Sequence, residues 1–264
     1  MLPQPCPILF PTQAMHLRVM SYNIKSGRFR PDSLEAVAQL IAAQLPDVVA
    51  LQEVDECLAR TERIPQTDWL ASRLKMYGIF APATQIDDGW YGIALLSRWQ
   101  AQKHERRLLF RPHYADADQR PRHDSEPRVM LCAVFSSFNL IVTHLGLTPD
   151  QQARQALDLV AFAKPWQLEQ ATVIAGDFNC EPDASELAPL REHFQEACGL
   201  VGIAGDARAT FPSGPIGARC PDGWHGAIDH IWLSPQVRVT SAAVIYDETC
   251  ASDHQPLVVD CEIQ

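Results

Sequence analysis

Polar side chains that could bind a metal ion or move a proton follow several short apolar runs of this chain. The segment GDFN places Asp177 and Asn179 two residues apart, and in extended geometry both side chains point to the same side. Such a pair can orient a water molecule and a phosphoryl oxygen. An Asx-type loop is the alternative, but similar polar residues recur in IDH at 228–230 and SDH at 252–254. The recurrence favours a hydrolytic site.

Two histidines occupy comparable positions. His254 directly follows Asp253, and a carboxylate beside an imidazole can hold one tautomer and favour the charged form. His144 follows another apolar run, although a lone histidine is more often structural than catalytic. His230 directly follows Asp229 and is expected to point away from it. We therefore take His144 and His254, with Asp229 and Asp253, as candidate site residues.

Asn23 and Glu53, near the start of the chain, carry oxygen atoms that could bind a hard metal ion. Alone, Asn23 in MSYNIKSG is typical of a turn, and Glu53 in VVALQEVD is typical of a surface carboxylate. Together they suit Mg²⁺, which prefers one or two carboxylates, with water and substrate phosphate completing its coordination.

The elements that must position these residues are short strands interleaved with helices. Periodicity predicts helices over 33–45, 66–77 and 150–164, and a hairpin within 128–145. Further strands are predicted at 17–24, 47–54, 91–98, 171–178, 228–235, 239–246 and 256–263. This mixture implies mixed sheets covered by helices, not a purely parallel doubly wound sheet.

Length and composition favour one domain over residues 16–264, after a flexible lead-in at 1–15 in which Met15 is an alternative start. The chain has no uninterrupted apolar run of about 18 residues, so we predict no membrane span. The 8 cysteines form no CxxC pair, which disfavours structural zinc and favours a reducing cytoplasm. A net charge of −10 argues mildly against nonspecific nucleic-acid binding. We expect a monomer.

The chain contains, in order, the motifs SYNIKSG, LQEVD, YGIALLSR, EPRV, VTHLGL, GDFNCEP, ATFPSG, IDHIWLS and SDHQPLVV, and the pattern covers residues 17–263. Jointly they resemble the endonuclease/exonuclease/phosphatase superfamily, which is deoxyribonuclease I-like, and its compact bacterial members in particular. The resemblance implies an α/β fold, a four-layer αββα sandwich of two packed mixed sheets flanked by helices. It also implies a phosphoester hydrolase that uses Mg²⁺ or Mn²⁺, with its site in a cleft at the strand ends.

The same resemblance implies how metal and water are held. Asn23 and Glu53 would help to bind the metal, and Asp253 would lie near it or orient His254. Asp177 would activate or orient the attacking water.

The resemblance also implies contacts with the phosphate. Asn179 would hold a phosphate oxygen and align Asp177, while His144 and His254 would stabilise developing charge. Asp229 would support the metal or a catalytic histidine. Candidate substrate-binding residues are Tyr91, Arg128 and Thr210.

The substrate stays open. A phosphodiesterase acting on a small or lipid-linked diester competes with a nuclease or DNA-repair phosphodiesterase, and with a non-catalytic binding scaffold. Residues 98–128 carry eight basic side chains against five acidic ones, which suits either an anion-binding surface or a solvated loop. Residues 212–226, rich in Gly and Pro, suit either a lip of the cleft or a passive connection.

Overall fold

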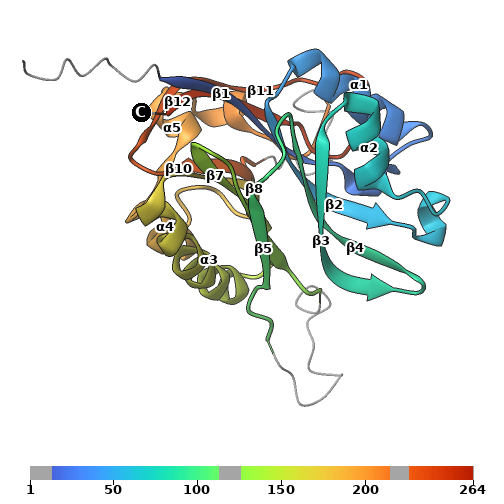
Figure 1. Cartoon of the computed structure of the whole chain (residues 1–264), viewed down its shortest axis with the longest axis horizontal. Coiled ribbons are helices and arrows are strands. Elements are labelled where there is room, and N and C mark those ends of the chain that lie inside the picture. Colours follow the sequence, from blue (N-terminus) through green and yellow to red (C-terminus); the bar gives the residue numbers. More distant parts are fainter. Residues whose placement is uncertain (1–13, 113–125, 215–225, 264) are drawn as a thin grey trace, which may run out of the picture.

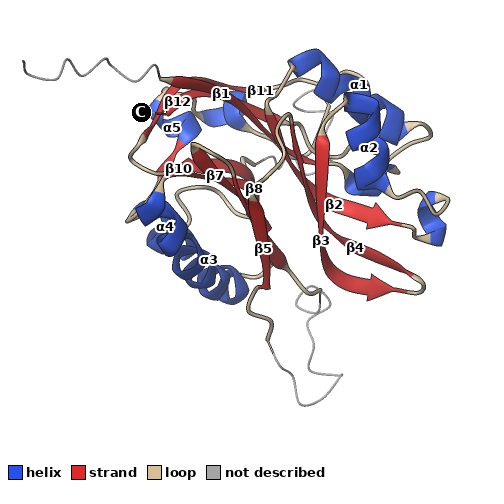
Figure 2. Ribbon diagram, viewed as in Figure 1, coloured by secondary structure: helices blue, strands red, loops and turns tan. Residues whose placement is uncertain are grey.

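The computed structural model of the chain describes residues 14–112, 126–214 and 226–263. Two six-stranded sheets pack face to face, and helices cover their outer faces (Figures 1 and 2). This is the four-layer α/β sandwich that the sequence predicted.

The first sheet is formed from both ends of the chain. Its strands are β1 (Met15–Asn23), β2 (Val48–Glu56), β3 (Tyr77–Ile86), β4 (Gly89–Ser97), β11 (Val237–Val244) and β12 (Leu257–Ile263). They lie in the order β11-β12-β1-β2-β4-β3. β1 and β2 run parallel, and the other neighbours run antiparallel. The sheet is therefore mixed.

The second sheet comes from the middle of the chain. Its strands are β5 (Lys103–Leu108), β6 (Val129–Val134), β7 (Phe138–His144), β8 (Ala171–Asp177), β9 (Gln195–Glu196) and β10 (Asp229–Leu233). They lie in the order β5-β6-β7-β8-β10-β9, with β7 and β8 parallel. β8 therefore lies centrally, with β7 on one side and β10 on the other.

Successive side chains of the central strands pack into two different apolar layers. In β1, Leu17 and Val19 join the core between the sheets, whereas Met20 and Tyr22 join the core beneath the helices of the first sheet. Successive side chains of a strand point to opposite faces, so an uninterrupted apolar run supplies both layers. This double burial keeps the strand ends rigid.

Three longer helices complete the outer layers. α1 (Ser33–Gln44) and α2 (Gln66–Leu74) pack on the first sheet, and α3 (Pro149–Glu169) packs on the second. The remaining helices in the described part of the chain are the short α4 (Ala188–Arg191) and α5 (Ala197–Leu200) and the 3₁₀ turns η1 (Lys25–Gly27), η2 (Ala59–Thr61), η4 (Ser185–Leu187) and η5 (Gly205–Arg208). Among described residues, no helix is long and apolar enough to cross a membrane.

The structure corrects several predicted boundaries. The helix predicted over 66–77 ends at Leu74, because Lys75 adopts a left-handed conformation (φ 56°) and β3 begins at Tyr77. α3 continues to Glu169, five residues beyond the predicted end. Met15, assigned to the lead-in, belongs to β1. Three edge strands, β3, β5 and β9, were not predicted as strands, and β5 lies inside the basic segment interpreted as a loop.

Candidate active site

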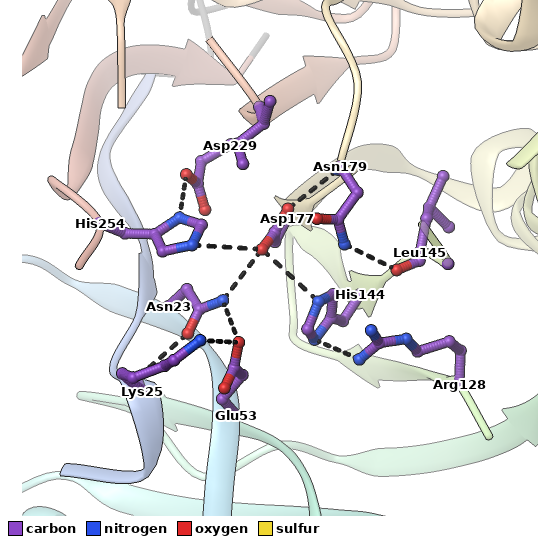
Figure 3. A network of polar contacts seen from close by, with 12 residues as sticks. Asn23, Lys25, Glu53, Arg128, His144, Leu145, Asp177, Asn179, Asp229 and His254 are labelled. Atoms are coloured by element: carbon purple, nitrogen blue, oxygen red, sulfur yellow. Dashed lines mark hydrogen bonds and ion pairs between the residues drawn. The ribbon is translucent and has the colours of Figure 1, made fainter. Parts of the chain in front are cut away.

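Strand pairing brings three of the predicted residues together at one end of the second sheet. The parallel register of β7 and β8 places His144 beside Asp177, and the antiparallel register of β10 and β8 places Asp229 beside Asp177. All three side chains are buried. Figure 3 shows them converging with residues of the first sheet.

Asn23 connects the two sheets. Its Nδ2 donates to Oε1 of Glu53 at 3.0 Å and to Oδ2 of Asp177 at 2.9 Å. Its Oδ1 accepts the backbone N–H of Lys25 at 3.1 Å. The amide nitrogen, which cannot bind a metal, is therefore the atom that faces the carboxylates. In this arrangement Asn23 orients Glu53 and Asp177.

Glu53 reaches this position through an irregularity inside β2. The register with β4 shifts between Leu51 and Val54, and Glu53 adopts a positive φ of 55°. A bulge of this kind turns a side chain away from the alternation of its strand. Glu53 lies inside β2, as in the predicted strand at 47–54, although β2 continues two residues further, to Glu56.

Asp177 lies at the centre of the polar network (Figure 3). Its Oδ2 is 3.5 Å from Nε2 of His144 and 3.7 Å from Nε2 of His254. Burial, reinforced by the nearby Asp229 carboxylate, raises the pKa of Asp177 from 3.8 to about 7. A carboxylate with a pKa near neutrality can accept a proton from water with good driving force.

His254 is oriented by Asp229. Its Nδ1 lies 2.8 Å from Oδ2 of Asp229, whereas its Nε2 lies 4.0 Å from Oδ1 of the adjacent Asp253. Burial lowers the pKa of His254, but the Asp229 and Asp177 carboxylates outweigh burial and raise it from 6.5 to about 10. The ring is therefore cationic at neutral pH. Of the two roles open for Asp253, orienting His254 does not fit this geometry.

His144 differs from His254 in charge. Nη1 of Arg128 lies 3.0 Å from its Nδ1, and because an arginine can only donate, Nδ1 accepts and Nε2 carries the proton. Burial, together with the positive charges of Arg128 and His254, lowers the pKa of His144 well below its usual range. Asp177 therefore lies between a neutral and a charged imidazole, each with an N–H turned towards it.

Asn179 aligns Asp177 by a different route from the one expected. Its backbone N–H donates to Oδ1 of Asp177 at 2.9 Å, and its Nδ2 donates to the carbonyl of Leu145 at 3.0 Å. Asn179 has a φ of 53°, so the extended geometry assumed from the GDFN spacing is wrong. The turn nevertheless fixes the Asp177 carboxylate at the end of β8.

Lys25 is a site residue that the sequence reasoning overlooked. Its ammonium lies 3.1 Å from Oδ2 of Asp253 and 3.6 Å from Oε1 of Glu53. A positive group already bridges these two carboxylates, so their spacing and charge suit a cation. Carboxylate oxygens are the ligands that Mg²⁺ and Mn²⁺ favour. The only sequence signal was a charged residue two positions after Asn23 in the same motif.

A second group of possible metal ligands is formed by Asp177, Asp229 and His254, whose ligand atoms lie within 4.8 Å of one another. His254, however, bonds Asp229 through Nδ1 and has a raised pKa. A protonated imidazole has no lone pair for a metal. Glu53 and Asp253 therefore fit a hard divalent cation better.

The three predicted substrate-binding residues have different surroundings. Tyr91 is buried and lines a cavity beside Glu53. Arg128 is buried against His144. Thr210 is fully buried, and its hydroxyl accepts the backbone N–H groups of Ile228 and Asp229 at 3.2 and 3.1 Å. Thr210 thus positions the start of β10, and the expected substrate contact is not supported.

The basic segment 98–128 and the Gly- and Pro-rich segment 212–226 lie partly outside the described residues. In the basic segment, Arg107 lies over the ring of Phe162 and Lys103 over that of Trp166, so these cations pack on α3. Residues 113–125 of it, and 215–225 of the predicted cleft lip, lie outside the described residues. His230 is buried and stacks on Phe178 with ring centroids 4.7 Å apart.

Solved structures with this fold are numerous. A functionally unknown conserved protein from Enterococcus faecalis V583 has a TM-score of 0.73 at 20% identity, with 94% of this chain and 100% of that chain covered. TDP2 of D. rerio, complexed with single strand DNA product, has a TM-score of 0.68 at 19% identity, covering 93% and 98%. The human Nocturnin catalytic domain with bound sulfate anion has a TM-score of 0.67 at 21% identity, covering 96% and 98%. These likenesses establish the fold.

Sequence comparison identifies the family. No curated protein matches the chain. The profile of the Endonuclease/Exonuclease/phosphatase family matches residues 20–254, which include every polar side chain of the network around Asp177. The chain therefore belongs to the endonuclease/exonuclease/phosphatase family, whose members are generally hydrolases acting on phosphoester bonds.

Proposed function

We propose that this protein is a divalent-metal-dependent phosphodiesterase that hydrolyses its substrate by in-line attack of water. One observation carries the proposal: Oδ2 of Asp177 lies between the N–H groups of a neutral His144 and a cationic His254. A carboxylate able to take a proton thus lies beside two groups able to bind a phosphate.

Asp177 orients the attacking water and accepts its proton. Asn179 and Asn23 hold the two carboxylate oxygens of Asp177 through separate hydrogen bonds, so little reorganisation is needed during reaction. The oxygen–phosphorus bond to water forms as the bond to the leaving oxygen breaks, and the leaving oxygen takes a proton from solvent. No covalent bond to the enzyme is required.

His254 and His144 stabilise the charge that develops on the phosphate. Preorganised donors of this kind are usually the largest single contribution to catalysis. Asp229 keeps His254 charged and fixes its ring, and Arg128 fixes the ring of His144. Asp229 and Arg128 are therefore positioning residues.

Glu53 and Asp253 are the proposed ligands of Mg²⁺ or Mn²⁺. When bound, the metal neutralises phosphate charge and stabilises the leaving oxygen. Lys25 must then leave the space between the two carboxylates. Because its side chain is 43% exposed, it can turn outward without breaking the core.

A nuclease or DNA-repair phosphodiesterase is the second candidate. It is favoured by the structural likeness to TDP2, which was solved with a single strand DNA product. The net charge of −10 weighs against broad nucleic-acid binding. A steep fall in DNA affinity with increasing salt would favour this candidate.

We also propose a monomer in a reducing cytoplasm. The six described cysteines are free, and three of them, Cys132, Cys198 and Cys261, are buried in apolar surroundings. Burial raises the pKa of each of these three thiols to about 12, so they stay protonated and unreactive.

Hydrolysis of bis(p-nitrophenyl) phosphate, compared with p-nitrophenyl phosphate, tests the proposal. We expect cleavage of the diester with Mg²⁺ or Mn²⁺, no cleavage with EDTA, and loss of activity in Asp177→Asn and His254→Ala. Asp150→Asn, at an exposed position on α3, is the matched control. If Asp177→Asn retained full activity, the assigned site would be wrong. If neither compound, DNA, RNA nor phospholipid were cleaved by folded protein, a binding scaffold would be favoured.

A further inference from the structure

A polar cavity of about 290 Å³ opens beside the candidate metal ligand Glu53. It lies between η1, the bulge at Glu53 in β2, η2 and the hairpin of β3 and β4. Six of its lining residues carry polar groups that matter for recognition: Lys25, Arg28, Glu53, Arg60, Tyr91 and Glu126. Nothing in the proposed hydrolysis uses Arg28 or Arg60.

Arg60 is fixed in place before any ligand arrives. Its Nε and Nη2 donate to the two oxygens of Asp55 at 2.8 and 2.7 Å, and the Asp55 side chain is fully buried. The guanidinium carbon lies 5.6 Å from the ring centroid of Tyr91. Its remaining nitrogen, Nη1, has no hydrogen-bond partner among described residues, and 34% of the side chain stays exposed. One edge of a rigid guanidinium is thus available to a ligand.

The cationic groups around the cavity that remain open to a ligand could bind an anion. Three cations line it with two carboxylates, Glu53 and Glu126, which both have partners. Glu126 accepts a hydrogen bond at 3.0 Å from Arg128, which does not line the cavity. Glu53 contacts Lys25. Lys25 also pairs with Asp253, and Arg60 pairs with Asp55, so the open groups are Arg28 and the free edge of Arg60. Arg28 is exposed and forms no ion pair within the described part of the chain. An anion bound here would therefore meet Arg28 and the open edge of Arg60.

The cavity adjoins the candidate active site through Glu53. Glu53 lines the cavity and also accepts from Asn23, whose amide donates to Asp177. A group bound in the cavity is therefore separated from Asp177 by the side chains of Glu53 and Asn23. This proximity suits a second group on the same substrate molecule.

We propose that the cavity binds a second phosphate of the substrate, next to the phosphodiester that is cleaved, with Arg60 as its specificity-determining residue. The inference rests on the proposed function and narrows its substrate class to molecules with two phosphates. Planar guanidinium groups match phosphate geometry better than ammonium groups do. Nucleotides and phosphorylated polyol headgroups both supply such a pair of phosphates.

Calorimetry with small ligands tests the cavity separately from hydrolysis. Thymidine 5′-monophosphate is compared with thymidine 3′,5′-bisphosphate, and inositol 1-phosphate with inositol 1,4-bisphosphate. In the unaltered protein we expect the bisphosphate of at least one series to bind about tenfold more tightly than its monophosphate, as one charge-assisted contact allows. The series with the larger difference identifies the source of the second phosphate.

Arg60→Gln should abolish this difference. Because that change leaves a buried Asp55 without its partner, the double variant Asp55→Asn/Arg60→Gln removes both charges and protects the fold. Arg28→Gln, at an exposed position, should reduce the difference. Arg63→Gln is the control, since Arg63 lies three residues from Arg60, pairs with Asp88 and does not line the cavity.

The outcomes separate the two proposals. The second-phosphate site would be overturned if the monophosphate and the bisphosphate bound equally tightly in both series. It would also be overturned if the difference in affinity persisted in the variants that lack Arg60. Cleavage of bis(p-nitrophenyl) phosphate with no such difference would leave the phosphodiesterase proposal intact and reject the cavity. A difference that depends on Arg60, without cleavage of any diester, would support the cavity and count against hydrolysis.

Discussion

Oδ2 of Asp229 lies 2.8 Å from Nδ1 of His254, and this contact joins β10 to the loop that precedes β12. The contact fixes both the charge and the orientation of the imidazole. Nε2 is thereby left facing Asp177. The geometry of the candidate site thus depends on a carboxylate that need not touch the substrate.

Replacing this carboxylate should change the pH dependence of activity. Asp229→Asn removes the largest favourable influence on the charged form of His254, whose pKa is about 10 in the intact protein. A histidine that acts in its protonated form loses activity as pH rises through its pKa, so the alkaline limb of the kcat profile should move to lower pH. We expect kcat at neutral pH to fall about 10²-fold. A profile with an unchanged alkaline limb would contradict this role, and Asp150→Asn serves as the control.

Asp177 should make the metal-free protein less stable as pH rises. Its pKa is about 7 in the folded protein against 3.8 for an ordinary aspartate. A raised folded-state pKa contributes stability below 3.8 that is lost as pH rises through about 7. Between pH 5 and 7.5 the free energy of unfolding should fall on the order of 2 kcal/mol from this group. His254 acts in the same direction from pH 6.5 to about 10.

Urea unfolding in EDTA measures this effect. Asp177→Asn should lose most of the slope between pH 5 and 7.5 and should be the more stable protein at the upper end. Added Mg²⁺ should flatten the slope of the unaltered protein, because a nearby cation favours the charged carboxylate. Identical slopes for the two proteins in EDTA would refute the assignment.

Much of this site could be predicted from sequence because its residues interrupt apolar runs. Asp177 and His144 each end a strand whose other residues are buried, so the change from apolar to polar is visible in the sequence. The fold followed from the same runs. The edge strands β3 and β5 could not be predicted from apolar runs. KHERRL in β5 is exposed throughout, and β3 contains Pro82. Exposed charges and proline are both common on edge strands, where they prevent pairing with another chain.

Tertiary contacts explain what the sequence could not provide. Adjacency suggested that Asp253 orients His254, and only the family resemblance pointed to Asp229, which is the partner although it lies 25 positions away in the chain. The bulge that redirects Glu53 and the left-handed turn at Asn179 are set by pairing with other segments. The role of Lys25 is visible only in the folded chain, where its ammonium lies between the carboxylates of Glu53 and Asp253.

Removing that ammonium should strengthen metal binding. Lys25→Met takes away a positive charge that lies 3.1 Å from Asp253 and competes for its carboxylate. We expect Mg²⁺ and Mn²⁺ to bind about tenfold more tightly, while the metal-free protein loses some thermal stability. Titration calorimetry and thermal melts with and without metal provide the measurement. Arg30→Met, an exposed cation nearby, controls for the general change in charge. Equal metal affinity in Lys25→Met and the unaltered protein would show that Lys25 does not occupy the cation position.

Arg128 should control which nitrogen of His144 carries the proton. Nη1 donates to Nδ1 at 3.0 Å, so Arg128→Met removes the donor that forces the proton onto Nε2. Nitrogen NMR of the unaltered protein should show a single neutral tautomer with the proton on Nε2, and the variant should show a mixture. Loss of the neighbouring charge should also raise the pKa of His144, since Arg128 lowers it. Because part of the population then no longer presents an N–H towards Asp177, kcat should fall about 10-fold or more. A variant with the same tautomer and the same pKa would mean that Arg128 does not position His144. Arg98→Met is the control for charge removal, because Arg98 is an exposed cation just after β4 that pairs with Asp47.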